Sequence, residues 1–190
     1  MRYTTTMRTV GIDEVGRGCW AGPLVAGAVI LHRPIAGLKD SKKLSKKQRE
    51  LLAGQIEATS VYGLGWVWPE EIDKYGITWS VKTAMERALN AITAEYDEVI
   101  IDGNINYLLE AKNSQAVIKA DDMVPAVSAA SIIAKVARDS YMEQAALTYP
   151  DYGFEKHVGY GTAMHVSALK LSGPCDIHRY SYKPIKALLA

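Results

Sequence analysis

Five short apolar segments lie along the chain, interspersed with stretches of helical periodicity. Short apolar runs bounded by turn residues are typical of buried strands, and here they cover residues 8–13, 23–32, 60–68, 98–102 and 115–121. Apolar residues at helical spacing predict helices over residues 45–58, 78–92, 124–147 and 162–173. The order is three strands with one helix inserted, then helix, strand, strand and helices. This order predicts an α/β fold in which helices flank one central mixed β-sheet.

Local signals mark the ends of several predicted elements. The glycine-rich segment between the first two strands has turn chemistry, which favours a β-hairpin. Ser45 is followed three residues later by Gln48, a capping-box pattern for a helix start. Thr78 is a natural N-cap for the next helix. Pro125 suits the first turn of the long alanine-rich helix.

Composition narrows the class of protein. The chain has 190 residues and a net charge of +1, so we expect one domain over residues 1–190, with a helical C-terminal extension from about residue 150. Cys19 and Cys175 form no metal-binding pair, and this usage favours a reduced interior. No apolar run approaches the ~20 residues of a membrane span. We therefore expect a soluble cytoplasmic protein without membrane contact, and a monomer by default.

Four acidic residues follow predicted strands: Asp13, Glu14, Asp102 and Asp121. If the three strands are neighbours and run the same way, these carboxylates converge at one edge of the sheet. Converging carboxylates repel unless a proton, a basic side chain or a hard cation neutralises them. Oxygen ligands without histidine or cysteine favour Mg²⁺ or Mn²⁺, and paired ions of this kind are typical of phosphodiester hydrolysis. The alternative is that these acids only solvate loops.

A basic stretch precedes the first predicted helix. Residues 39–50 contain Lys39, Lys42, Lys43, Lys46, Lys47 and Arg49, against two acids. A helix N-terminus ordinarily prefers acidic residues, so this placement is electrostatically unfavourable. The stretch is consistent with phosphate binding, and equally with a solvated charged face.

Seven segments in order resemble type 2 ribonuclease H, specifically ribonuclease HII. They are "GIDEVGRGCWAGPLVAGAVIL", "LKDSKKLS", "EEIDKYGI", "IIDGN", "KADDMVPAVSAASIIAKVARD", "YGFEKHVGYGT" and "HRYSYKPI", and together they extend from about residue 8 to residue 185. The resemblance implies a ribonuclease-H-like fold and a metal-dependent endonuclease. It implies hydrolysis of the RNA strand of RNA–DNA hybrids and incision 5′ of ribonucleotides embedded in duplex DNA. The products would carry a 3′-hydroxyl and a 5′-phosphate, and the cellular roles would be ribonucleotide removal and RNA primer removal.

The resemblance also assigns roles to individual residues. It makes Asp13, Glu14, Asp102 and Asp121 both the catalytic residues and the ligands of two Mn²⁺ or Mg²⁺ ions, with Asp13 shared between the ions. Substrate contacts fall on further residues. These are Gly16, Arg17 and Gly18 at the ribose 2′-hydroxyl, Lys42, Lys43 and Lys46 at phosphates, and Tyr160 at the deoxyribose after the junction. The glycines could equally form a plain hairpin turn, and Tyr160 could be a core residue.

Other positions stay open. On the long helix, Ser128, Ser131, Lys135 and Arg138 are expected to support the acids or contact the nucleic-acid backbone, although their spacing also fits packing. His157 lies near Tyr160 in sequence, but a lone histidine is more often structural, so no histidine is taken as a metal ligand.

Several positions depart from the family pattern. Ala120 replaces the usual glycine, and Asp122 follows Asp121, so two adjacent carboxylates are available as the ligand. Alignment with the family pattern favours Asp121. Val158 stands where lysine is usual, and Trp20 follows Cys19 where smaller residues are common. Two alternatives remain, a ribonuclease HIII-like enzyme and a non-catalytic nucleic-acid-binding module of the same fold.

Overall fold

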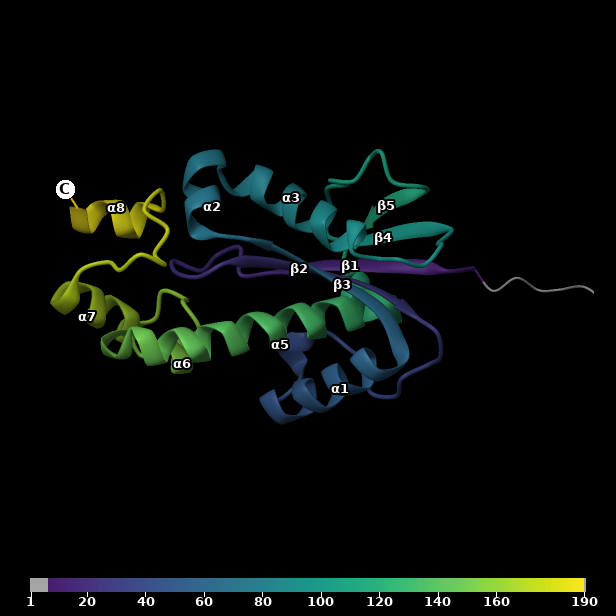
Figure 1. The fold of residues 1–190 in the computed structure, drawn as a ribbon, viewed down its shortest axis with the longest axis horizontal. Coiled ribbons are helices and arrows are strands. Elements are labelled where there is room, and N and C mark those ends of the chain that lie inside the picture. The colour runs from purple at the N-terminus through teal and green to yellow at the C-terminus, as the bar shows by residue number, and fades with distance from the viewer. Residues whose placement is uncertain (1–6, 190) are drawn as a thin grey trace, which may run out of the picture.

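The computed structural model describes residues 7–189, which form a five-stranded sheet covered by helices (Figure 1). The strands are β1 (Thr9–Val15), β2 (Leu24–Leu31), β3 (Ser60–Val67), β4 (Glu98–Asp102) and β5 (Ser114–Val117), in the spatial order β3-β2-β1-β4-β5. β1 pairs antiparallel with β2 and parallel with β4, and β4 pairs parallel with β5. The predicted hairpin and the mixed sheet are therefore confirmed.

Helices lie on both faces of the sheet. They are α1 (Lys46–Thr59), α2 (Pro69–Tyr75), α3 (Ile77–Asn90), α4 (Ala120–Met123), α5 (Pro125–Thr148), α6 (Phe154–His157), α7 (Ala163–Ser172) and α8 (Lys183–Leu189), with short 3-10 turns η1 (Ser41–Lys43) and η2 (Pro150–Tyr152). In Figure 1, α3 covers one face, and α5 with α1 covers the other. Within residues 7–189, no helix has both the length and the apolar character needed to span a membrane.

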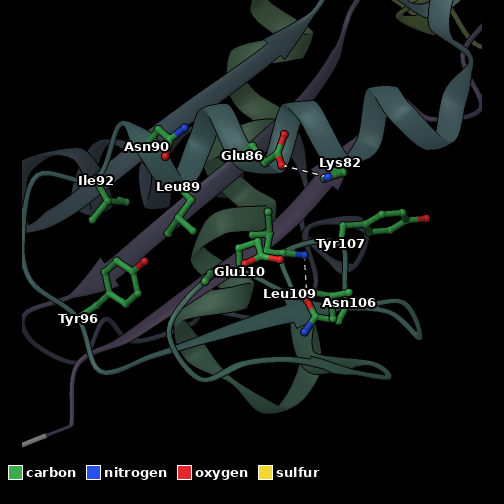
Figure 2. Close-up of a pocket in the computed structure, with 12 residues that line it drawn as sticks. Lys82, Glu86, Leu89, Asn90, Ile92, Tyr96, Asn106, Tyr107, Leu109 and Glu110 are labelled. Atoms are coloured by element: carbon green, nitrogen blue, oxygen red, sulfur yellow. Dashed lines mark hydrogen bonds and ion pairs between the residues drawn. The ribbon is translucent and has the colours of Figure 1, made fainter.

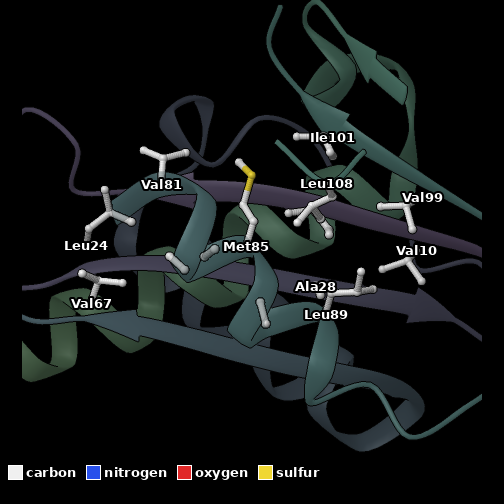
Figure 3. Close-up of a cluster of buried hydrophobic side chains, with 14 of the residues drawn as sticks. Val10, Leu24, Ala28, Val67, Val81, Met85, Leu89, Val99, Ile101 and Leu108 are labelled. Atoms are coloured by element: carbon white, nitrogen blue, oxygen red, sulfur yellow. The ribbon is translucent and has the colours of Figure 1, made fainter. Parts of the chain in front are cut away.

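Alternation along β1 assigns its side chains to the two layers. Val10 and Ile12 are fully buried in the cluster under α3, together with Met85 of that helix (Figure 3). Because successive strand residues point to opposite faces, Gly11 and Asp13 face the α5 side. Asp13 is thus a buried carboxylate in the layer between the sheet and α5.

Glycines allow both helices to approach the sheet closely. A Cβ atom added to Gly11 would lie 2.1 Å from the backbone carbon of Ala126 in α5, and one on Gly27 would lie 2.5 Å from the Ala130 carbonyl oxygen. On the other face, a Cβ on Gly65 would lie 1.9 Å from the carbonyl oxygen of Ala84 in α3. Only glycine permits such contacts between a strand and a helix backbone.

Most predicted element boundaries are confirmed, including the capping box between Ser45 and Gln48 and Pro125 at the start of α5. The fifth strand is an exception. It ends at Val117, and Asp121 lies in α4 instead of at a strand end. Lys119 adopts the left-handed conformation, with φ 60° and ψ 35°, and this ends the extended backbone.

One further prediction about a helix end is wrong. Thr78 is not an N-cap, because α3 begins at Ile77 after Gly76, whose φ of 81° also ends α2. A glycine with positive φ can end one helix and begin the next without the side-chain cap that the sequence suggested. The helix predicted over residues 162–173 is confirmed as α7, and the structure adds α8 after it.

We expect Gly11→Ala to destabilise the fold by about 1–3 kcal/mol, because the methyl group has no room between β1 and α5. Gly54→Ala is the matched control, since this helical position has nothing within 4 Å of an added Cβ. It should gain about 0.5–1 kcal/mol from the helix propensity of alanine. Urea titration of both variants measures the difference, and an equal effect of the two would contradict the packing argument.

Candidate active site

Two parallel strands bring the first three acids together. β1 and β4 are registered from Thr9 opposite Glu98 to Ile12 opposite Ile101. Asp13 and Asp102 are the next residues of the two strands, so both follow the last registered pair. Glu14 continues β1, and its amide donates to Asp13 Oδ1 at 2.8 Å. The expected convergence of strand-end acids is therefore present for these three residues.

Asp121 reaches the same place from a helix. The amide of Ala120 donates to Asp102 Oδ1 at 2.8 Å, which holds the start of α4 against the end of β4. Ser128 Oγ donates to the Asp121 carbonyl at 2.7 Å and fixes the same short helix from α5. The Asp121 side chain is buried, whereas the neighbouring Asp122 is exposed and turns towards Lys43. Of the two adjacent carboxylates, only Asp121 belongs to the acid group.

The electrostatics show how closely the acids interact. Burial raises the pKa of Asp13 to about 7, and repulsion from Glu14 and Asp102 adds to this. Burial and repulsion from Asp102 also raise the pKa of Glu14, against the opposing effect of Arg17. Burial, followed by Asp102, raises the pKa of Asp121. Hydrogen bonds from Ser131 and the Glu14 amide partly stabilise the ionised form of Asp13.

This donor set suits a hard divalent cation by its chemistry. The four groups supply only carboxylate oxygens, the ligands that Mg²⁺ and Mn²⁺ prefer. Their mutual repulsion is the condition that a cation would relieve. As the side chains lie, however, no three or more histidine, cysteine or acidic side chains among residues 7–189 form a ready cage for an ion. The acids gather, but metal binding would need their side chains to adjust.

The three predicted phosphate-binding lysines lie in different surroundings. Lys42 lies close enough to the acids to lower the pKa of Glu14 and of Asp121. Lys43 Nζ is 2.6 Å from Asp122 Oδ1, and Lys46 pairs with Glu143 of α5 and with Glu50. One lysine thus faces the acids directly, while the other two are held by carboxylates of α1, α4 and α5.

Side chains from α5 and from the C-terminal segment pack against the Gly16-Arg17-Gly18 turn and fix its backbone. Gly16 has φ 90°, and a Cβ there would lie 2.3 Å from Arg138 Nε. The Arg17 carbonyl accepts from Tyr182 Oη at 2.7 Å and from Arg179 Nη1 at 3.2 Å. The Arg17 guanidinium is exposed, 3.9 Å from a Glu14 oxygen. The turn therefore places the Arg17 side chain outward and the Arg17 carbonyl inward.

Two fully buried arginines organise this region, and one of them was missed in the sequence. Arg138 donates to the carbonyls of Pro23, Ala21 and Val158, so its role is support rather than substrate contact. Arg179 donates to the carbonyls of Gly22 and Arg17. The available signal was the segment "HRYSY", which contains an arginine among aromatic residues.

Two other helix residues that were expected to support the acids also have partners. Ser131 Oγ lies 2.9 Å from Ser41 Oγ of η1, and Lys135 pairs with Asp139 at 2.8 Å. Ser131 thereby links the basic stretch to the layer that contains Asp13.

Tyr160 is 39% exposed and lies next to the turn. The Gly159 carbonyl before it accepts from the Trp20 amide at 2.8 Å. Lys135 Nζ and Arg138 Cζ lie 5.8 and 6.0 Å from the centre of the Tyr160 ring. Burial raises the pKa of Tyr160 to about 12, so the hydroxyl stays protonated. Trp20 packs at Gly161, where an added Cβ would lie 2.2 Å from its ring, so it is a packing residue.

A separate hollow of about 720 Å³ lies between α3 and the loop after β4 (Figure 2). Its lining includes Lys82, Glu86, Tyr96 and Tyr107, and none of the four acids. The acids therefore do not share this hollow.

We expect Asp13→Asn to raise the melting temperature in EDTA, because it removes a buried negative charge while keeping an acceptor for the Glu14 amide. The folded-state pKa of about 7 exceeds the ordinary 3.8, so ionisation of Asp13 costs stability as the pH rises through this interval. The gain should be largest above pH ~7 and vanish towards pH ~4, at about 2–4 °C per kcal/mol. Asp151→Asn, at an exposed position, is the control and should change little. A gain that does not depend on pH would contradict the explanation.

Comparison with known proteins identifies the family. A family model described as Ribonuclease HII matches residues 10–185. A ribonuclease HII from Nitrosococcus oceani is 46% identical over 185 residues, which cover 96% of this chain and 92% of that protein.

Solved structures agree with this result. The ribonuclease H2 of Pyrococcus horikoshii OT3 superposes with a TM-score of 0.81 at 28% identity, covering 96% of this chain and 97% of that one. The RNase HII in a PCNA complex from Archaeoglobus fulgidus gives 0.80 at 30% identity, covering 93% and 96%. These matches favour ribonuclease HII over the ribonuclease HIII alternative. The chain belongs to the ribonuclease HII family of ribonuclease H endonucleases.

Proposed function

We propose that this protein hydrolyses the RNA strand of RNA–DNA hybrids and incises 5′ of ribonucleotides embedded in duplex DNA, leaving a 3′-hydroxyl and a 5′-phosphate. Its cellular work would be ribonucleotide removal and RNA primer removal. One observation carries the proposal. Four mutually repelling acids converge beside a rigid Gly16-Arg17-Gly18 turn and the half-exposed Tyr160 ring.

Asp13, Glu14, Asp102 and Asp121 would hold two Mg²⁺ or Mn²⁺ ions, with Asp13 shared between them. When bound, such ions supply an activated water and stabilise the leaving oxygen of a phosphodiester. The chain itself contributes the gathering of the acids, through the parallel pairing of β1 with β4 and the Ala120 amide that donates to Asp102.

The turn and Tyr160 would read the two sugars that flank the RNA–DNA junction, both on the 3′ side of the cut. The Arg17 carbonyl already accepts two internal hydrogen bonds. The ribose 2′-hydroxyl is therefore assigned to the backbone amides of the turn. The Tyr160 ring would pack on the deoxyribose beyond the junction, where the missing 2′-hydroxyl leaves room for a flat ring. Lys42, Lys43 and Lys46 would hold phosphates by charge.

The direct test is cleavage of a duplex that contains one ribonucleotide, with the cut position mapped. We expect incision on the 5′ side in Mg²⁺ or Mn²⁺ and none in excess EDTA. Cutting that continues in EDTA would contradict the metal dependence. Cutting 3′ of the ribonucleotide would contradict the proposed chemistry.

Asp121→Asn and Asp122→Asn form a matched pair, because the two residues are adjacent and only Asp121 joins the acid group. Loss of a direct ligand should lower kcat by at least about 100-fold in Asp121→Asn. Asp122→Asn should keep kcat within a few-fold and bind duplex more tightly, because Lys43 loses its internal partner. The reverse ranking of the two kcat values would show that Asp122 is the ligand.

Lys42→Gln should weaken duplex binding of every sequence and reduce the slope of log affinity against log salt by about one. Lys47→Gln, in the same basic stretch but without a proposed contact, is the control. Fluorescence anisotropy over a salt series measures both slopes. Equal slopes for Lys42→Gln and the unaltered protein would return Lys42 to a solvated surface role.

A further inference from the structure

Three histidines lie buried beneath the segment that carries Tyr160, and the proposed chemistry uses none of them. His157, His165 and His178 are each at most 6% exposed. The rings of His157 and His165 stack with centres 4.5 Å apart and planes 15° apart. His165 Nε2 lies 2.9 Å from His178 Nε2, so the second and third rings are hydrogen-bonded to each other.

The partners of these rings fix where each proton lies. A carbonyl only accepts, so His165 Nδ1 must donate to the Tyr160 carbonyl at 3.0 Å. Its Nε2 is then an acceptor and receives the proton of His178 Nε2. His178 Nδ1 in turn accepts from the Cys175 amide at 2.9 Å. It therefore cannot donate to the Cys175 carbonyl at 3.1 Å, whereas the Cys175 thiol at 3.2 Å can donate to it.

His157 also binds the segment that carries Tyr160, and its hydrogen-bond partners fix its proton in the same way. Its Nε2 donates to the Tyr152 carbonyl at 2.8 Å, and its Nδ1 accepts from the Gly159 amide at 3.2 Å. Each of the three rings thus carries one proton and has both nitrogens paired. Burial lowers the pKa of His165 and of His178 to about 4, so both rings are neutral at physiological pH and keep this arrangement.

The segment held in this way has a strained backbone. Val158 has φ 44° and Gly159 has φ 85°. A β-branched residue in the left-handed region persists only where its surroundings hold it. The histidines bond to Gly159 and Tyr160, the two residues that follow Val158. The Gly159 carbonyl also accepts from the Trp20 amide, which connects this segment to the chain that follows the glycine turn.

We infer that His165, oriented by His178, is a positioning residue that fixes the Tyr160 backbone and thereby sets the preference for deoxyribose immediately after the RNA–DNA junction. This inference rests on the proposed function, in which the Tyr160 ring meets that sugar. A change at His165 should therefore alter discrimination between two substrates, rather than the chemical step common to both.

The test compares His165→Asn with His165→Gln. The asparagine amide nitrogen occupies the place of Nδ1 and can donate to the Tyr160 carbonyl, whereas the glutamine amide reaches the place of Nε2 and leaves that carbonyl without a donor. Two duplexes are used. The junction duplex has a single ribonucleotide followed by DNA, and the other has a continuous RNA strand. His165→Gln should lose about fivefold to tenfold of the preference for the junction duplex, mainly through KM. His165→Asn should retain most of it.

A double-mutant cycle separates positioning from general structure. In a Tyr160→Ala background, His165→Gln should not change the preference further. His32→Asn, at an exposed position outside the network, should leave the preference unchanged in either background. Equal losses in His165→Asn and His165→Gln would overturn the inference, as would a loss that persists without the Tyr160 ring.

Binding of both duplexes is also measured in EDTA by fluorescence anisotropy. This measurement separates failure of the positioning role from failure of the proposed cleavage. An unaltered protein that binds the junction duplex preferentially in EDTA but cuts neither duplex when Mg²⁺ or Mn²⁺ is supplied would overturn the proposed cleavage alone. An unaltered binding preference in His165→Gln would overturn the positioning role alone.

Discussion

The close approach of α5 to the backbone of β1 and β2 is the constraint on which the candidate site depends. Gly11 and Gly27 remove the side chains that would hold the helix away from the sheet. The helix then presents Ser131 to Asp13, Ser128 to the Asp121 backbone and Arg138 to the turn after β1. One packing contact therefore sets the positions of the acids, the turn and the Tyr160 segment together.

Among the residues that the structure describes, two buried arginines in this region are paired with backbone carbonyls instead of carboxylates. Arg138 and Arg179 are fully buried, yet within residues 7–189 neither forms an ion pair with a carboxylate. Their partners are backbone carbonyls of the turn and of the Val158 segment, which satisfy the guanidinium protons without cancelling the charge. Burying a guanidinium charge costs free energy. Here the buried guanidinium groups fix the direction of the turn's carbonyls.

The sequence predicted the parts of the fold that depend on local patterns. Apolar runs identified all five strands, and the capping box at Ser45 and Pro125 marked two helix starts correctly. The errors at Thr78 and Asp121 have a common physical origin. Gly76 and Lys119 adopt left-handed or related backbone conformations that end one element and begin another, and a hydropathy pattern does not contain this information.

The candidate site also contains some residues that could be predicted from the sequence and others that could not. Strand-end acids could be named from the sequence because parallel neighbours carry their carboxyl ends to one edge. The family resemblance already favoured Asp121 over Asp122. The contact that turns Asp122 towards Lys43, and the role of Arg179, depend on residues distant in the chain. The histidine network is of the same kind, since its members are separated by a helix and a loop. Such contacts become visible only once the packing of α4, α5 and the C-terminal segment is known.

Helix α4 gives the site an uneven rigidity. Asp13, Glu14 and Asp102 stand on strands whose backbone is paired within the sheet, whereas Asp121 stands on a helix of four residues. So short a helix has few hydrogen bonds of its own, and its place is set by the Ala120 amide on Asp102 and by Ser128. Three of the carboxylates thus stand on a backbone fixed by the sheet, and the fourth stands on a short helix that can shift. Under the proposed cation binding, closing the acid group would be a local movement of Asp121 at one end of the sheet, with the core beneath it unchanged.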